Sequence, residues 1–343
     1  MESPRLTLKR HLRTLTDLVN ATDGLKEAWA AARRSGEWIR FAWKGRPAPS
    51  DAVLIVGSGR SGTTWLMYIL AAVPGMLEIF EPLNPRRVPE VDALTGWSAD
   101  SVISRSYYLR PGDDDPAWHD LLERILRGQV RNYWTDYTRS TFWPERFLIK
   151  LIRANLMLGY LYDHFQPAIV YIRRHPCAVV LSRLQRGWQA SVQDILRQEA
   201  LVEDHLRPWL PEIEREADLL GAHAVWWAVE NYVADHDLST RPHCALCYEE
   251  MVLAPAETLA RICSWLDVPV PRDWQKRAQT PVPHSRHLQA NARIEERLAA
   301  WRHKLSSEDQ QRVLAWAQRL SLDTYDAEPL PHRLRATLGE APR

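Results

Sequence analysis

The chain has 343 residues, of which 45% are hydrophobic and 25% charged, so it can bury the core of one large α/β domain or two modest ones. Its formal net charge of +1 gives no bulk electrostatic reason to expect nucleic acid as a partner. No apolar run approaches the roughly 18 residues of a membrane span and no signal peptide opens the chain, so we expect a cytoplasmic location.

Residues 1–50 are predicted to form a peripheral helical extension. Apolar residues recur there at helical spacing, and a second segment places aromatic side chains among arginines and a lysine: Trp29, Trp38, Phe41 and Trp43. Two interpretations stay open. The segment either packs on the following domain or makes peripheral contact with a membrane.

The stretch from 51 to 70 predicts a strand, an anion-binding loop and a helix. Val53 to Val56 form an uninterrupted apolar run, as expected of a strand buried on both faces. Gly57, Gly59 and Gly62 then allow a tight turn in which backbone N–H groups and a helix N-terminus converge on an anion.

The glycine spacing alone fits more than one class of loop. It satisfies the dinucleotide pattern G-x-G-x-x-G, with Glu78 and Glu81 near the distance of a ribose-binding acid. It nearly satisfies the nucleoside triphosphatase pattern, but Thr63 stands at the lysine position, which disfavours ATP or GTP as the ligand.

The loop from Arg60 to Trp65, Arg-Ser-Gly-Thr-Thr-Trp, resembles the 5′-phosphosulfate loop of sulfotransferases that use 3′-phosphoadenosine-5′-phosphosulfate (PAPS). Cytosolic members have lysine where Arg60 stands, whereas carbohydrate sulfotransferases carry Arg-Ser-Gly. The resemblance implies that the donor is bound by Arg60, Ser61, Gly62, Thr63, Thr64 and Trp65.

Two further strands are predicted at 76–80 and 147–149, each followed by charged residues. Glu81-Pro82 after the first, and Lys150 and Arg153 after the second, also resemble the sulfotransferases. Cytosolic members have a histidine at the position of Ile152. We therefore expect Glu81 to be the catalytic base, with Arg60 and Lys150 neutralising charge on the leaving phosphate.

Histidines elsewhere, such as His119 or His175, remain alternative bases. Between the two strands, residues 86–143 are expected to form a variable loop-and-helix insertion. Two interpretations stay open: the insertion covers the acceptor site, or its run Asp113 to Asp115 is simply a solvated face. A helix is predicted over 154–165.

A fourth strand at 169–172 leads into a second anion motif. Arg174 and Ser182 are eight residues apart, as in the 3′-phosphate motif of sulfotransferases. An arginine binds a phosphate through two parallel hydrogen bonds, and a hydroxyl on the next helix can complete the shell. His175 and Ala178 depart from the residues usual in that motif.

The last predicted strand covers 244–248, and the resemblance places Tyr248 near the adenine. Cys244 and Cys247 within it are interpreted as buried thiols rather than a metal or redox pair. Residues 285–293 lie where the family supplies a further 3′-phosphate contact, without a residue that can be named. Ser307 and Gln310 predict a capping box, and the tail after Asp326 is expected to be loose.

Together these observations predict an α/β fold of the P-loop type, with a mostly parallel sheet, helices on both faces and an N-terminal helical extension. The expected domains are 1–50, 51–326 and a tail at 327–343. The resemblance implies sulfuryl transfer from PAPS to the hydroxyl of a carbohydrate, glycolipid or other small molecule, releasing adenosine 3′,5′-bisphosphate (PAP) without a metal. A Rossmann-type NAD(P) oxidoreductase and a non-catalytic nucleotide-binding protein stay open as alternatives.

Overall fold

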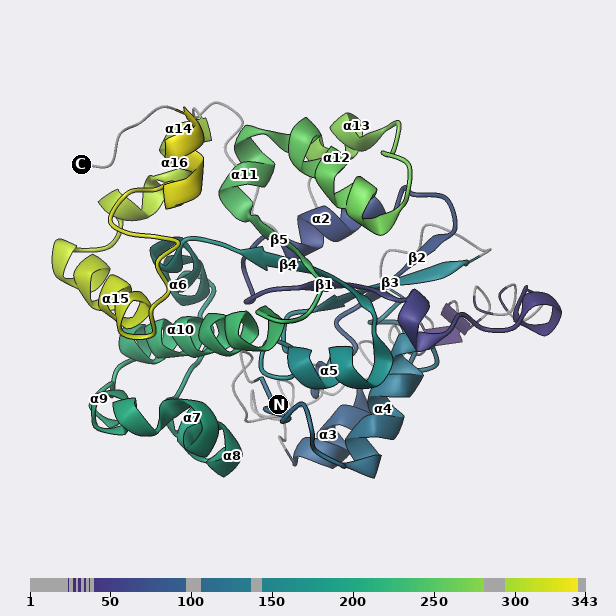
Figure 1. The fold of residues 1–343 in the computed structure, drawn as a ribbon, viewed down its shortest axis with the longest axis horizontal. Helices are drawn as coiled ribbons and strands as arrows, with labels where there is room; N and C mark the ends of the chain where they lie inside the picture. The colour runs from purple at the N-terminus through teal and green to yellow at the C-terminus, as the bar shows by residue number, and fades with distance from the viewer. Residues whose placement is uncertain are drawn as a thin grey trace, which may run out of the picture.

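The computed structural model describes residues 24, 27, 28, 30, 31, 34, 37, 40–96, 106–136, 144–280 and 294–338. Its centre is one five-stranded parallel sheet in the order β2-β3-β1-β4-β5 (Figure 1). The strands are β1 (Val53–Val56), β2 (Met76–Phe80), β3 (Arg146–Leu151), β4 (Ala168–Arg173) and β5 (Cys244–Cys247). The predicted parallel sheet is therefore confirmed.

Helices cover both faces of the sheet (Figure 1). Those before β4 are α2 (Thr63–Leu70), α3 (Pro89–Thr95), α4 (Pro116–Leu126) and α5 (Leu158–Phe165), preceded by the 3₁₀ turn η1 (Pro49–Asp51). Between β4 and β5 lie α6 (Pro176–Leu184), α7 (Gln193–Leu196), α8 (Glu199–Leu201), the π-helical turn η2 (Val202–Leu206), η3 (Arg207–Trp209), α9 (Leu210–Glu214) and α10 (Leu219–Leu238). The remainder are α11 (Tyr248–Leu253), α12 (Pro255–Leu266), α13 (Trp274–Gln279), α14 (Ile294–Leu298), η4 (Ala300–His303), α15 (Ser307–Arg319) and α16 (His332–Leu338).

The strands are uninterrupted apolar runs because both of their faces are buried. Leu54 and Val56 of β1 face a core formed with α4 and α5, whereas Val53 and Ile55 face a second core formed with α2 and α12. A third core joins α6, α10 and α15, and it buries Trp226 and Trp227 of α10. These cores hold the strand ends in fixed positions.

The strand order also separates this fold from a dinucleotide-binding one. Here β1 pairs with β3 and β4, whereas the Rossmann order places the second strand beside the first. The oxidoreductase alternative is not supported by this topology.

Three local predictions are wrong. Tyr248 begins α11 rather than ending β5, and the serine that caps α15 is Ser306, whose side chain accepts a hydrogen bond from Asp309 N. The segment after Asp326 is not simply loose, because it contains α16, and Arg333 forms a 2.7 Å ion pair with Glu250.

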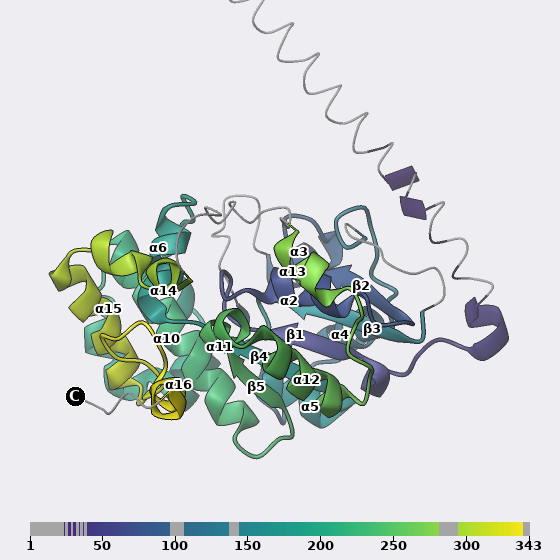
Figure 2. The ribbon, with the colours of Figure 1, turned by 90° about the horizontal axis from the view of Figure 1, so that it is seen from above.

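The described residues between 24 and 44 and the C-terminal helices lie at opposite ends of the sheet (Figure 2). The described residues between 24 and 44 are helical, and Phe41 among them packs on Phe147 of β3 at 6.2 Å between ring centroids. Within the described part of the chain, no helix has the length and apolarity that a bilayer crossing requires. The apolar positions predicted before residue 24 lie outside the described residues.

Candidate active site

The loop between β1 and α2 has the tight geometry that its glycines predict. Gly62 has φ +92°, and a Cβ added there would lie 2.5 Å from Cδ2 of Tyr248. Arg60 also has a positive φ, +86°, which is uncommon for a residue with a side chain. Only glycine fits at position 62, and its absent side chain lets the Tyr248 ring lie against the loop.

The two anion motifs meet directly. Arg60 Nε donates a hydrogen bond to Ser182 Oγ at 3.1 Å, and Arg174 Nη1 donates to the carbonyl oxygen of Arg60 at 3.0 Å. The Arg174 guanidinium lies 4.3 Å from the centroid of the Tyr248 ring, within range of a cation–π interaction. Segments more than 110 residues apart in sequence therefore form one site.

The neighbouring arginine points elsewhere. Arg173 pairs with Asp235 of α10 and donates to Thr324 at 2.6 Å, so its charge serves the contact between β4 and its surroundings. Only Arg174 of this pair faces the loop.

A second charged group lies at the ends of β2 and β3. The Glu81 carboxylate accepts from Lys150 Nζ and, at 3.3 Å, from Arg153 Nη1. Its backbone has φ +43° and its N–H donates to the carbonyl of Lys150 at 3.1 Å, which fixes the turn that follows β2. All three side chains are at least nine-tenths buried.

Burial and pairing set the protonation of this group. Burial alone would raise the pKa of Glu81, but the charges of Lys150 and Arg153 outweigh it and hold the pKa below its usual range. Burial lowers the pKa of Lys150, and the Glu81 carboxylate offsets only part of this effect. At neutral pH, Glu81 is therefore a carboxylate.

These groups line one cavity of about 950 Å³. The cations among its described lining residues are Arg60, Arg86, Arg87, Lys150, Arg153, Arg174, Arg186 and Arg297, and Glu81 is the only carboxylate among them. Burial, followed by the charges of Arg186 and Arg174, lowers the pKa of Arg60 to about 10. Such a concentration of positive charge favours a ligand with several negative charges.

Most of the predicted site residues line this cavity. They are Arg60, Gly62, Thr63, Thr64, Trp65, Glu81, Lys150, Arg174, Ser182 and Tyr248. Ser61 does not line the cavity; its side chain is fully buried, and its hydroxyl has no hydrogen-bond partner among the described residues. The region 285–293 lies outside the described residues.

Neither alternative histidine faces the cavity. His175 is fully buried, stacks on Trp301 at 4.2 Å, and burial lowers its pKa to about 3. His119 packs on Phe165 at 4.8 Å. No histidine occurs among the described lining residues, and the described part of the chain holds no cluster of side chains suited to a metal ion.

Sequence reasoning missed the polar network beneath the loop. Arg183 Nη2 and the carboxylate of Glu230 form a 2.9 Å ion pair, and both side chains are 1% exposed. Ser58 Oγ donates to the same carboxylate at 2.8 Å, and Ser106 Oγ donates to it at 3.0 Å. This network joins the loop to α6 and α10.

No local sequence signal announces this pairing, since Arg183 and Glu230 are 47 positions apart on separate helices. The one hint in the sequence is the charge of these residues. Each is a charged residue within an apolar helical pattern, and such residues are seldom buried without a partner.

A sequence model of the sulfotransferase family matches residues 52–272 of the chain. This region contains both anion motifs, the Glu81–Lys150 pair and all five strands. No curated protein matches the chain significantly.

Solved sulfotransferase structures resemble the chain at low identity. The sulfotransferase domain from the curacin biosynthetic pathway is 17% identical, with 83% of this chain and 99% of that chain covered and a TM-score of 0.47. The sulfotransferase domain from the Synechococcus PCC 7002 olefin synthase is 18% identical, with 82% and 96% covered and a TM-score of 0.40. Mouse sulfotransferase SULT7A1 complexed with PAP is 11% identical, with 88% and 92% covered and a TM-score of 0.42.

Proposed function

Because this chain belongs to the sulfotransferase family, we propose that it transfers a sulfuryl group from PAPS to the hydroxyl group of an acceptor, releasing PAP. The observation that carries the donor assignment is the direct contact between Arg60 and Ser182. It joins the loop suited to a 5′-phosphosulfate with the motif suited to a 3′-phosphate. A donor with both groups matches this arrangement better than a nucleotide with a single phosphate chain.

The donor is proposed to bind over β1, β4 and β5. Loop N–H groups with Thr63 and Thr64 bind the phosphosulfate, while Arg174 and Ser182 bind the 3′-phosphate. Trp65 and Tyr248 both line the cavity, and their rings provide apolar surface for the adenine. The Trp65 ring is held by a 3.0 Å hydrogen bond from its Nε1 to the carbonyl of Ala278.

The reaction is a substitution at sulfur. An acceptor oxygen forms a bond to sulfur as the bond between sulfur and the 5′-phosphate oxygen breaks, and the acceptor proton passes to Glu81. Arg60 and Lys150 stabilise the charge that develops on the leaving phosphate. A sulfate ester and PAP result.

The size of the cavity bears on the acceptor. A cavity of about 950 Å³ has room for a donor and a second molecule, and the proposed acceptors are hydroxyl groups of carbohydrates, glycolipids or other small molecules. A screen of such acceptors with labelled donor measures transfer directly. Donor binding without turnover of any acceptor in this screen would favour the non-catalytic nucleotide-binding alternative.

The donor assignment is tested by thermal unfolding with PAP. A ligand at 100 times its dissociation constant stabilises the folded state by about 2.7 kcal/mol, enough to raise the melting temperature measurably. We expect PAP to do so, and NADH or Mg-ATP to have little effect. Arg174→Ala should remove most of the shift, while Arg319→Ala, an exposed arginine on α15, should keep it. Stabilisation by NADH and not by PAP would contradict the proposal.

A further inference from the structure

The side of the cavity over β2 and β3 differs chemically from the side over β1 and β4. If the donor occupies the two anion motifs, as proposed above, the acceptor enters over β2 and β3, beside Glu81. The residues that line this side beyond Glu81 and Lys150 include Phe80, Asn84, Arg87 and Trp134, which we call the acceptor wall. The side chains of the acceptor wall therefore indicate the chemical groups of the acceptor that it can bind.

The acceptor wall combines an aromatic surface with a cation. The rings of Phe80 and Trp134 meet edge to face at 5.1 Å between centroids. The Arg87 guanidinium lies 5.4 Å from the Trp134 ring, and Arg87 Nη1 donates to the Tyr133 hydroxyl at 2.9 Å. Both partners are neutral. No carboxylate pairs with Arg87 in the part of the chain that the structure describes, so its positive charge is available to a ligand.

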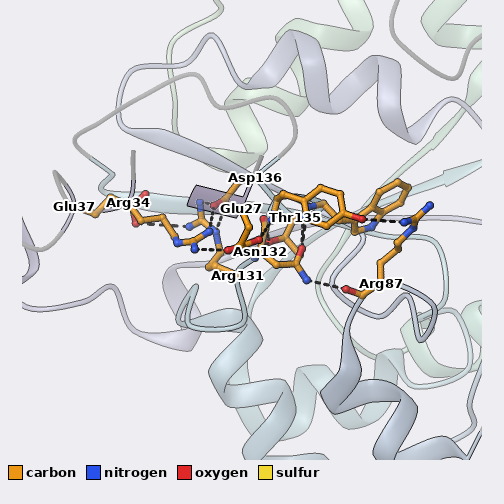
Figure 3. A network of polar contacts seen from close by, with 10 residues as sticks. Glu27, Arg34, Glu37, Arg87, Arg131, Asn132, Thr135 and Asp136 are labelled. Atoms are coloured by element: carbon orange, nitrogen blue, oxygen red, sulfur yellow. Dashed lines mark hydrogen bonds and ion pairs between the residues drawn. The ribbon is translucent and has the colours of Figure 1, made fainter. Parts of the chain in front are cut away.

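Arg87 is held in place by backbone contacts. Asn132 Nδ2 donates to the carbonyl of Arg87 at 2.8 Å, and the side chain of Asn132 also accepts from Trp134 N at 2.9 Å. Asn132 thus ties together the two chain segments that supply the wall's cation and its ring (Figure 3).

The segment that carries Trp134 is anchored further by ion pairs. Arg131 pairs with Asp136, both almost fully buried, and Arg34 of the N-terminal helical residues contacts Asp136 and Glu27 at 2.7 Å each. Glu27 in turn accepts from Tyr133 N at 2.7 Å. Figure 3 shows this chain of contacts running from Glu37 and Arg34 at one end to Arg87 at the other. The acceptor wall is therefore assembled before any ligand binds.

We propose that the acceptor carries an anionic group, such as a carboxylate, sulfate or phosphate, which Arg87 binds while the neighbouring part of the acceptor packs on Phe80 and Trp134. A guanidinium that is already positioned binds an oxyanion through charge-assisted hydrogen bonds with little loss of side-chain freedom. Arg87 is thus a residue that determines acceptor specificity, separate from the donor motifs.

The test compares acceptors that differ only in charge. Two matched pairs are titrated by calorimetry into protein saturated with PAP: 4-nitrophenyl β-D-glucuronide with the glucoside, and 4-hydroxybenzoate with its methyl ester. We expect the anionic member of at least one pair to bind about tenfold or more tightly, with the preference weakening as salt is raised.

The variants assign that preference to one side chain. Arg87→Met keeps an unbranched apolar stem without the charge and should abolish the preference, and Arg87→Lys should retain part of it. Arg319→Met is the matched control, because Arg319 also lies over a tryptophan ring, 5.0 Å from Trp316, but does not line the cavity. PAP affinity should be unchanged in all three variants.

The outcomes separate this inference from the function on which it rests. Equal binding of both members of each pair, or a preference that survives in Arg87→Met, overturns the inference while PAP binding stays intact. Failure of the protein to bind PAP at all contradicts the donor assignment, and the inference falls with it.

Discussion

Glu81 lies between two cations at the end of β2, and both of its possible roles arise from that position. As a base it receives the acceptor proton, whereas as a structural group it holds Lys150 and Arg153 in the cavity. Glu81→Gln keeps the shape and removes the negative charge. If Glu81 is the base, we expect turnover to fall at least about a hundredfold with PAP affinity retained, measured by labelled-donor assay and calorimetry. Lost PAP binding together with a lower melting temperature would instead indicate the structural role.

The pH dependence gives a second measure of the same residue. Because the pKa of Glu81 is depressed below 4.5, the carboxylate gains its proton only as the pH falls below that value. We therefore expect no loss of kcat/KM attributable to Glu81 between about pH 5 and 7, and an acid limb below this range. An acid limb near pH 6.5 that is unchanged in Glu81→Gln would point to a different base.

Charged residues in the site were predictable where they follow a strand. Glu81 and Arg174 follow directly after β2 and β4, and Lys150 is the penultimate residue of β3; parallel strands bring such residues to one edge of the sheet. Arg87 and Trp134 had no such signal, because they lie in the irregular stretch between β2 and β3. Their positions depend on contacts such as Asn132 to Arg87, which join residues 45 positions apart.

At the scale of elements, α6 and α10 support the loop between β1 and α2. Arg183 of α6 pairs with Glu230 of α10, and Glu230 accepts a hydrogen bond from Ser58 of the loop. We expect Glu230→Ala to lower the free energy of unfolding by about 3–5 kcal/mol, because it leaves the buried Arg183 charge without its carboxylate. Urea unfolding measures this loss. PAP binding should weaken as well, since Ser58 loses the same partner.

The matched control is Glu214→Ala at the exposed end of α9, which should change stability by less than about 0.5 kcal/mol. Equal stability of Glu230→Ala and the control would show that the loop does not depend on this network.

Element types were easier to predict than element ends. All five strands were predicted, because burial on both faces leaves an apolar run that few helices imitate at this length. The end of β5 was misplaced because Cys247 N donates to the Glu250 carboxylate at 3.2 Å, a capping contact that starts α11 at Tyr248. At α15 two adjacent serines satisfy the same capping pattern, and only the backbone geometry selects Ser306.

At the scale of the whole molecule, the N-terminal residues present two different surfaces. Phe41 packs against the sheet domain, but Trp43 is 83% exposed beside Lys44. We propose that this end contacts an anionic membrane surface. The full chain should then float with vesicles that contain phosphatidylserine and not with neutral ones, and Trp43→Ser should reduce the floated fraction.

Trp265→Ser is the control for flotation, since Trp265 on α12 is also exposed, at 41%, but lies on another part of the surface. A chain that begins at Ala48 should stay with the soluble fraction. If the full chain stays there too, the extension serves only to pack against residues 131–136 and the sheet.

The strand order has a consequence for how this protein can diversify. The proposed donor site is formed by the chain after β1, β4 and β5, whereas the acceptor wall is formed by the turn after β2 and the segment before β3. On this proposal, the contacts that hold the acceptor wall, such as Asn132 to the carbonyl of Arg87, do not involve the donor motifs. Related proteins can therefore use the same sulfuryl donor with different acceptors. Exchanging residues 84–87 together with 131–136 should likewise change the acceptor and leave the donor unchanged.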